Sequence, residues 1–331
     1  MKHILLIATG GTIASRPTDA GLTPMITSDE ILEFVPEVAE ICHVSAIQIA
    51  NIDSTNMKSA HWLLMVRCIR DNYDRYDGFV ISHGTDTMAY TAAALSYLIQ
   101  HTAKPIVLTG SRKSIFLRDT DARTNLINAF RYAADDRAHG VRLVFDGMVI
   151  DGTRARKMRT KSFNAFSSMD YPELGVIREG QYLQYIPEPV PAQPPVFTTE
   201  LNDRIFVLKL IPGMDASIFS WLETHYDALV IESFGVGGVP CEGDEGFIGA
   251  IERWVASGKV IVMTTQVPHE GSDMEIYQVG YQVKNRFGIL EAYDMTLEAI
   301  VTKLMWILGQ TRDPEQVRKL FYQPVQHDQI R

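Results

Sequence analysis

The sequence predicts an α/β protein made of two parallel-sheet domains, a larger N-terminal one and a smaller C-terminal one. Short aliphatic runs alternate with helical stretches up to about residue 150, and a similar alternation resumes after residue 200. Runs that are apolar throughout are typical of strands covered by helices on both faces of a parallel sheet. The chain of 331 residues is also longer than one hydrophobic core usually serves.

In the first region, the aliphatic runs predict strands and the stretches between them predict helices. Strands are expected at residues 3–8, 44–51, 78–82, 105–109 and 141–146, and helices near 28–35, 59–73, 87–100 and 119–135. The first of these helices opens with the run Thr27-Ser28-Asp29-Glu30. This is a capping-box pattern, in which the first and last side chains each accept a hydrogen bond from a backbone N–H at the helix start.

A proline-rich linker divides the chain into domains at residues 1–186 and 200–331. Five of the fifteen prolines fall between Pro187 and Pro195. Proline lacks an amide donor and fixes φ, so residues 187–199 are expected to form an extended, semi-rigid linker. In the second region we expect strands at 204–210, 228–233 and 259–264, and helices near 215–225, 244–257, 296–309 and 313–321.

The net charge of the chain disfavours two classes of partner. The net charge of −9 and the pI near 5.5 argue against a nucleic-acid or anionic-membrane partner, because neither surface attracts an acidic protein. One basic cluster is present, formed by Arg154, Arg156, Lys157, Arg159 and Lys161. A solvated surface is an equally good interpretation of all of these except Lys157.

Cysteine usage predicts a cytoplasmic protein without a metal centre. Cys42, Cys68 and Cys241 are few, odd in number and widely separated, and they match no metal-ligand spacing or disulfide framework. The apolar run near the N-terminus is shorter than a signal-peptide core and is expected to be the first strand. No stretch approaches the length that crosses a membrane.

Two polar motifs carry most of the functional information. Thr9-Gly10-Gly11-Thr12 follows the first strand, and His83-Gly84-Thr85-Asp86 follows the third. Each motif places a threonine hydroxyl and glycine-freed backbone N–H groups at the carboxyl end of a strand, where ligands bind in open α/β sheets. The motifs therefore indicate nucleophilic attack on a small polar molecule. A plain strand-to-helix turn is the alternative for the first motif.

Individual residues near these motifs have two interpretations each. Asp86 either caps the following helix, or it binds a substrate ammonium group or positions a lysine. His83 is expected to be a structural histidine rather than a base. The polar cluster at 51–57 is either a loop before a helix or a source of hydroxyl donors for a carboxylate. Lys157, if buried beside Asp86, would be able to exchange protons with a hydroxyl.

Taken together, these motifs resemble the L-asparaginase family, most closely its bacterial type I, cytoplasmic branch. Thr9-Gly10-Gly11-Thr12-Ile13-Ala14, the Asp53-Ser54 cluster, His83-Gly84-Thr85-Asp86-Thr87-Met88 and Lys157 occur in the family's order and spacing. The resemblance extends over nearly the whole chain. It implies hydrolysis of L-asparagine to L-aspartate and ammonia, with no metal and no organic cofactor, by a homodimer or homotetramer.

The resemblance also implies residue roles. Thr12 is expected to be the primary nucleophile. Thr85, Asp86 and Lys157 are expected to activate water, with Lys157 relaying a proton through Thr85. Asp86 would also hold the α-ammonium group of the substrate. The α-carboxylate would be held by Ser54 and Thr55, and Gly84 would belong to the same binding site.

The chain departs from the family pattern at three places. Leu22 stands where the mobile loop often carries a tyrosine that helps to activate the nucleophile, and the acid of the first triad is not located by the sequence. Gly238 stands where some members place an asparagine from a neighbouring subunit. Val267 replaces a cysteine found in some allosteric type I enzymes. Allosteric control and the preference between asparagine and glutamine therefore stay open.

Two other functions are compatible with the motifs. One is the glutamine-hydrolysing subunit of an archaeal-type tRNA amidotransferase. That subunit carries an extra N-terminal domain, whereas the first motif here begins at Thr9, and the acidic charge disfavours tRNA. The other is a non-catalytic sensor that binds an amino acid or a nucleotide.

Overall fold

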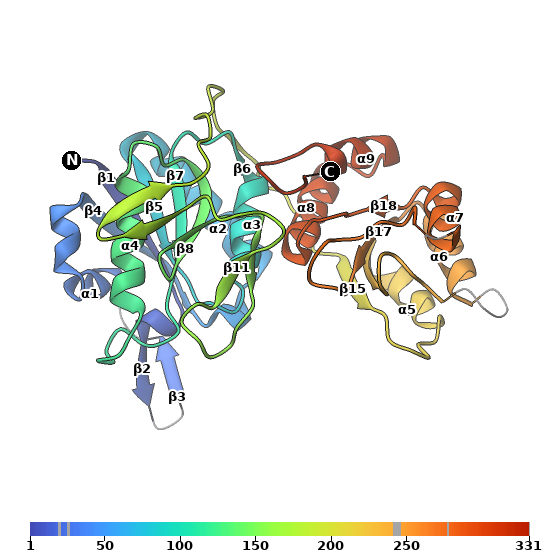
Figure 1. Cartoon of the computed structure of the whole chain (residues 1–331), viewed down its shortest axis with the longest axis horizontal. Coiled ribbons are helices and arrows are strands. Elements are labelled where there is room, and N and C mark those ends of the chain that lie inside the picture. Colours follow the sequence, from blue (N-terminus) through green and yellow to red (C-terminus); the bar gives the residue numbers. More distant parts are fainter. Residues whose placement is uncertain (19–20, 25–26, 241–245, 277, 331) are drawn as a thin grey trace. The chain divides into compact units, whose positions relative to one another are not determined.

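The computed structural model describes residues 1–18, 21–24, 27–240, 246–276 and 278–330; at 16–18 and 21–24, and at a few helical positions near 280, it describes the backbone alone. The chain divides into two compact units, Met1–Thr199 and Glu200–Arg331. Each unit contains its own sheet and its own helices (Figure 1). The α/β class predicted from the alternation of strands and helices is confirmed.

The first unit is built on an eight-stranded sheet with a parallel core. Five strands run parallel, in the spatial order β4, β1, β5, β7, β8. Their bounds are β1 His3–Gly10, β4 His43–Ile52, β5 Gly78–Ser82, β7 Pro105–Thr109 and β8 Gly140–Phe145. All five predicted strands are therefore present, within one or two residues at most ends.

An antiparallel extension of this sheet was not predicted. Strands β9, β12 and β13 continue the sheet beyond β8, each antiparallel to its neighbour. Their bounds are β9 Met148–Asp151, β12 Gly175–Arg178 and β13 Gln181–Gln184. Between β9 and β12 the chain forms a separate two-stranded ribbon, β10 (Ala155–Lys157) paired with β11 (Phe166–Ser168). Lys157 therefore lies on this ribbon and not on a strand of the main sheet.

Helices cover both faces of the sheet (Figure 1). Their bounds are α1 Ser28–Glu33, α2 Ser59–Asn72, α3 Met88–Leu98 and α4 Ala122–Ala134. One core packs α1 and α4 against alternate residues of the strands, including Ile4, Leu6 and Val80, all fully buried. The predicted capping box starts α1, because the Thr27 side chain accepts from the Glu30 amide and the Glu30 carboxylate accepts from the Thr27 amide.

Short elements complete the first unit. The hairpin β2–β3 (Ser15–Thr18 and Gly21–Pro24) projects away from the body of the first unit in Figure 1. Residues 187–195 contain neither helix nor strand, and the chain then forms β14 (Val196–Phe197), which pairs with β6 (Ile99–Gln100). The end of the proline-rich segment is thus attached to the first unit.

The second unit has a four-stranded, fully parallel sheet in the order β15, β16, β17, β18. The strands are β15 Ile205–Lys209, β16 Ala228–Ser233, β17 Val260–Thr265 and β18 Leu290–Glu291; the helices are α5 Ile218–His225, α6 Gly246–Ala256, α7 Gln278–Phe287, α8 Leu297–Gln310 and α9 Pro314–Tyr322. Helix α7 and strand β18 were not predicted. The Thr296 side chain caps α8 by accepting from the Ala299 backbone N–H.

Two glycines, Gly11 and Gly84, allow the backbones of the two threonine motifs to lie in close contact in the first unit. A Cβ atom at Gly11 would lie 2.5 Å from both the Cα and the N of Gly84, and a Cβ at Gly84 would lie 2.5 Å from Ser54 Oγ. Gly11 also has φ 82° and ψ −178°, a conformation that side-chain-bearing residues avoid. The backbones of the two motifs can approach this closely only because neither position carries a side chain.

His83 lies in the core directly before this contact. Its Nδ1 is 2.7 Å from the Gly84 carbonyl oxygen, so Nδ1 carries the proton and donates it. Its Nε2 therefore accepts from the Thr91 hydroxyl at 2.9 Å, and that hydroxyl accepts from Trp62 Nε1 at 2.9 Å. Burial lowers the pKa of His83 from its ordinary 6.5 to about 4, with the Gly84 hydrogen bond opposing the shift. The structural interpretation of His83 is confirmed.

The glycine contact predicts a large stability loss for Gly11→Ala. The added methyl group meets backbone atoms of Gly84 and also forces an unfavourable φ, which together should lower the free energy of unfolding by about 2–5 kcal/mol. Gly213→Ala is the matched control, because Gly213 has a similar positive φ of 76° but no atom near its added Cβ. The control should lose only about 1–2 kcal/mol in urea denaturation. Equal losses in the two variants would contradict the contact.

The lowered pKa of His83 predicts a pH-dependent stability. In the unfolded chain His83 becomes protonated below about pH 6.5, whereas in the folded chain it becomes protonated only near pH 4. The free energy of unfolding therefore falls as the pH is lowered from 6.5 to 4. Relative to His83→Asn, the wild type should lose up to about 3 kcal/mol more between pH 7.5 and 4. Parallel pH profiles of the two proteins, measured by urea denaturation, would refute the assignment.

Candidate active site

The candidate site lies at the carboxyl edge of the parallel core of the first unit. The chain order of the five parallel strands is second, first, third, fourth, fifth, so the order reverses between β1 and β5. Ligands of open α/β sheets bind at such a switch point. Thr12 follows β1 and Thr85 follows β5, so the fold places both threonine motifs at this point.

Lys157 contacts Thr85 and Asp86 together. Its Nζ donates to Thr85 Oγ1 at 2.9 Å and forms an ion pair with the Asp86 carboxylate. Thr85 is buried, and the Lys157 side chain is only 14% exposed, whereas the Asp86 side chain is 54% exposed. Lys157 lies more than seventy positions from the other two in the sequence. Their meeting requires the β10–β11 ribbon to return to the end of β5.

Asp86 does not cap the helix that follows it. The N-cap of α3 is Thr87, whose hydroxyl instead donates to the Ser54 carbonyl at 2.8 Å. The capping interpretation of Asp86 is therefore wrong, and its carboxylate is directed to Lys157. Because that carboxylate is half exposed, part of it stays accessible to a ligand.

Ser54 and Thr55 occupy a 3-10 turn (Ser54–Asn56) after β4, and their hydroxyls are used differently. Ser54 is buried against Gly84, and its Oγ accepts from the Asp86 backbone N–H at 3.3 Å. Among the described residues, none accepts a hydrogen bond from the Ser54 hydroxyl. Thr55 is exposed, and its hydroxyl donates to Asp53 at 2.8 Å. A carboxylate ligand would have to displace that bond to use Thr55.

Thr12 begins a 3-10 turn (Thr12–Ala14) at the end of β1. Gly11 precedes it, and the Gly11 N–H donates to the Ile52 carbonyl at 2.9 Å, which ties the turn to the end of β4. Among the residues described with side chains, none hydrogen-bonds to the Thr12 hydroxyl. The side chain of Leu22, at the position where the family often has tyrosine, lies outside the described part of the chain.

Arg112 is a site residue that the sequence did not predict. It follows β7, and its Nη1 donates to Thr85 Oγ1 at 3.2 Å while its Nη2 donates to the Thr160 carbonyl. Thr85 Oγ1 therefore accepts from two cations. The only sequence signal was a charged residue soon after the end of a buried strand, which is common on protein surfaces.

Only some residues of the basic cluster around Lys157 are exposed to solvent. Arg154 is fully buried, with its guanidinium over the Tyr171 ring at 5.8 Å, so the solvated interpretation is wrong for this residue. Arg159 and Lys161 are exposed, and Arg156 is half-buried. Exposure increases along this segment, from buried Arg154 through half-buried β10 residues to the exposed turn before β11.

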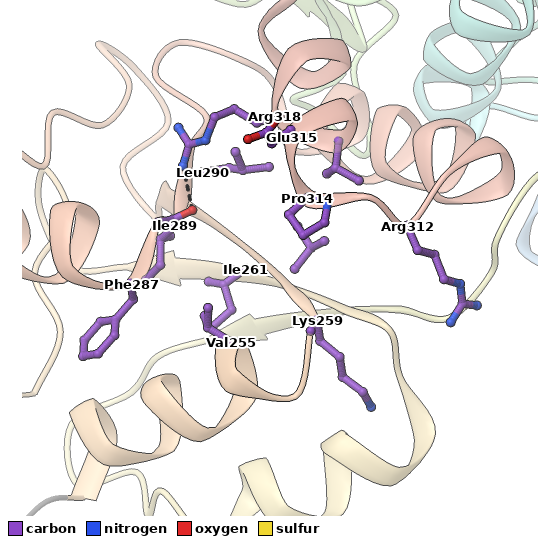
Figure 2. A pocket seen from close by; sticks show the side chains of 14 residues that line it. Val255, Lys259, Ile261, Phe287, Ile289, Leu290, Arg312, Pro314, Glu315 and Arg318 are labelled. Atoms are coloured by element: carbon purple, nitrogen blue, oxygen red, sulfur yellow. Dashed lines mark hydrogen bonds between the residues drawn. The ribbon is translucent and has the colours of Figure 1, made fainter.

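A separate cavity of about 400 Å³ lies in the second unit (Figure 2). It opens at the amino ends of β17 and β18, whereas the carboxyl edge is where ligands of parallel sheets bind. The arginines and the lysine that line it have partners already: Arg318 donates to the Gly288 carbonyl at 2.7 Å, Arg312 pairs with Asp227 at 2.8 Å, and Lys259 donates to the Tyr226 carbonyl at 2.8 Å. We assign no chemistry to it.

Gly238 and Val267, the two departures in the second unit, lie in loops after β16 and β17. Gly238 forms a bridge with Phe234, and Val267 is exposed. Neither position offers a polar side chain to stand in for the family's residue. Across the described parts of both units, none of the helices combines the length and the apolar character that a membrane span requires.

Comparison with known proteins covers both units. The family model "Asparaginase, N-terminal" matches residues 3–190, and "Glutaminase/Asparaginase C-terminal domain" matches residues 204–321. The L-asparaginase of Thermococcus kodakarensis is 35% identical over 96% of this chain and 96% of its own length. The crystal structure of L-asparaginase I from Vibrio cholerae superposes with a TM-score of 0.89 and 30% identity over 99% of both chains.

A second group of relatives also matches nearly the whole chain. A glutamyl-tRNA(Gln) amidotransferase subunit from Pyrococcus abyssi is 33% identical over 97% of this chain but over only 75% of its own length. The resemblance inferred from the threonine motifs is confirmed by the two family models and by the matches to L-asparaginases. The chain belongs to the asparaginase family.

Proposed function

We propose that this protein is an L-asparaginase that hydrolyses L-asparagine to L-aspartate and ammonia through a threonine acyl-enzyme. The observation that carries the proposal is the contact of Lys157 with both Thr85 and Asp86, which lie at the sheet edge shared with Thr12. A mostly buried lysine side chain beside a threonine hydroxyl supplies a proton acceptor where hydrolysis needs one. The proposed chemistry uses groups of the protein itself and calls for no metal or organic cofactor.

The first half-reaction is acylation. The Thr12 oxygen attacks the carbon of the side-chain amide, the C–N bond breaks, and the nitrogen leaves as ammonia after taking up the hydroxyl proton. The oxygen of the tetrahedral intermediate would be stabilised by backbone N–H groups near Thr12 and Thr85. The product of this step is an ester between Thr12 and the β-carboxyl group of aspartate.

The second half-reaction is hydrolysis of that ester. Lys157, in its uncharged form, takes the proton of Thr85, and Thr85 takes a proton from the attacking water. The water oxygen bonds to the ester carbon, the bond to Thr12 breaks, and the proton on Lys157 returns to the Thr12 oxygen. The 2.9 Å distance between Lys157 Nζ and Thr85 Oγ1 suits direct proton transfer.

Substrate capture would use the charged groups at the mouth of this site. The half-exposed Asp86 carboxylate suits the α-ammonium group of an amino acid. The Ser54 hydroxyl, which accepts from the Asp86 backbone N–H, can donate its proton to the α-carboxylate, and Gly84 lies directly beside it. Thr55 would join only after giving up its bond to Asp53. The site therefore selects a free amino acid rather than an amide within a peptide.

The amidotransferase subunit is the second candidate function, and the matches to the Pyrococcus protein and its counterparts favour it. A quarter of that relative's length has no counterpart in the match, and the net charge of −9 disfavours tRNA. A sensor without turnover would need no proton relay of the kind that Lys157 suits. The free thiols of Cys42 and Cys68 are consistent with a cytoplasmic protein, and we expect a homodimer or homotetramer as in the family.

Ammonia release tests the proposed function directly. We expect the purified protein to release ammonia from L-asparagine with saturation kinetics in a coupled assay. One methylene in the substrate is worth only about 1–3 kcal/mol, so some glutamine turnover is also compatible with the proposal. Turnover of glutamine with no turnover of asparagine would instead support the amidotransferase function. Calorimetric binding of an amino acid without ammonia release would support the sensor.

Substitution of the two threonines separates their roles. Thr12→Ala should abolish even the first release of ammonia, because no other hydroxyl takes its place. Thr85→Val should lower steady-state turnover by at least about 1,000-fold while leaving one ammonia per site in the first turnover. The exposed Thr224→Val in the second unit is the control and should behave as wild type. Near-native activity in either active-site variant would remove that residue from the mechanism.

A further inference from the structure

We infer that Arg112 is a further catalytic residue, which stabilises the Thr85 oxygen as it loses its proton during hydrolysis of the acyl-enzyme. This inference rests on the proposed function. Arg112 donates from Nη1 to Thr85 Oγ1, the atom that also accepts from Lys157. An oxygen with both lone pairs directed at cationic donors is a hydroxyl prepared to carry negative charge.

The loop that carries Arg112 is fixed by hydrogen bonds to the side chains of Asp121 and Asn125. The Asp121 carboxylate accepts from the backbone N–H groups of Arg112, at 2.9 Å, and of Lys113, at 3.0 Å. Asn125, in the first turn of α4, donates to the Gly110 carbonyl at 2.9 Å and to Asp121 at 3.2 Å. The backbone of Arg112 is therefore fixed by buried groups, and its guanidinium reaches the site from a rigid base.

The two terminal nitrogens of the Arg112 guanidinium have hydrogen-bond acceptors, whereas its Nε has none among the described residues. Nη1 contacts Thr85 and Nη2 contacts the Thr160 carbonyl, three residues after Lys157. Arg112 thus joins the hydroxyl to the segment that delivers the lysine. Its Nε is enclosed and has no hydrogen-bond partner among the described residues. A purely structural arginine in this position would be expected to satisfy Nε as well.

Arg112 and Lys157 differ in how long they keep their charge. Lys157 has to be uncharged to accept the Thr85 proton, so it contributes no cation to the oxygen at the start of the step. Arginine stays charged throughout. Arg112 is therefore the cation that faces Thr85 Oγ1 while the proton moves from Thr85 to Lys157. Removing such a donor from a developing oxyanion typically costs about 10²–10³ in rate.

The test compares Arg112→Met with Arg112→Lys and with Arg118→Met, an exposed arginine on the same loop. For asparagine, Arg112→Met should lower kcat by about 100-fold and change KM by less than about threefold. Because the substitution leaves acylation unchanged, the time course of ammonia release by Arg112→Met should show one ammonia per site released rapidly, followed by a slow phase. Arg112→Lys should recover about tenfold in kcat, because a lysine keeps the charge without the planar fork. Arg118→Met should match the wild type.

Hydroxylamine provides a readout that a structural role would not change. It attacks the acyl-enzyme without help from a base, forms the hydroxamate and releases Thr12, so it should restore most of the turnover of Arg112→Met. A variant with near-native kcat, or one that loses the rapid phase and gains nothing from hydroxylamine, would overturn the role of Arg112 alone. Wild-type protein that releases no ammonia would overturn the proposed function and this inference with it.

Discussion

The close contact between Gly11 and Gly84 is the constraint on which the candidate site depends. It joins the turn after β1 to the turn after β5 at the point where the strand order reverses, and Ser54 is packed against the same glycine. Side chains at these two positions would push the threonine motifs apart. The sheet alone brings the strand ends to one edge, but this contact sets the spacing of the groups on them.

The positive charge of the site comes from residues outside the two threonine motifs. Lys157 arrives on the β10–β11 ribbon, and Arg112 on the loop after β7, and both donate to the Thr85 hydroxyl. Asp86 balances the lysine and stays half exposed. In the proposed mechanism each of these groups has a separate role. Asp86 binds the substrate and Lys157 transfers a proton. The Arg112 guanidinium stays positively charged beside Thr85 Oγ1 throughout the step. His83 beneath them is neutral and packs the core.

The parallel core and the threonine motifs could be predicted from sequence because both follow from local pattern. An apolar strand that ends in Thr-Gly or His-Gly-Thr must present those residues at the carboxyl edge. The antiparallel strands β9, β12 and β13 were missed because they are short and interrupted by turns, and α7 because its sequence is largely polar. Arg112 and the burial of Arg154 depend on tertiary contacts, for which a single sequence has no periodic signal. The expectations for Leu22 stay predictions.

The most direct test of the account is to locate the acyl group. Wild-type protein and Lys157→Met should be mixed with L-asparagine, quenched in acid within the first turnovers and mapped by peptide mass spectrometry. We expect an aspartyl ester on Thr12 that accumulates in the lysine variant, because its hydrolysis lacks the proton acceptor. An ester on Thr85, or ammonia release by the wild type with no ester on any threonine in either protein, would contradict the assigned roles of the two motifs.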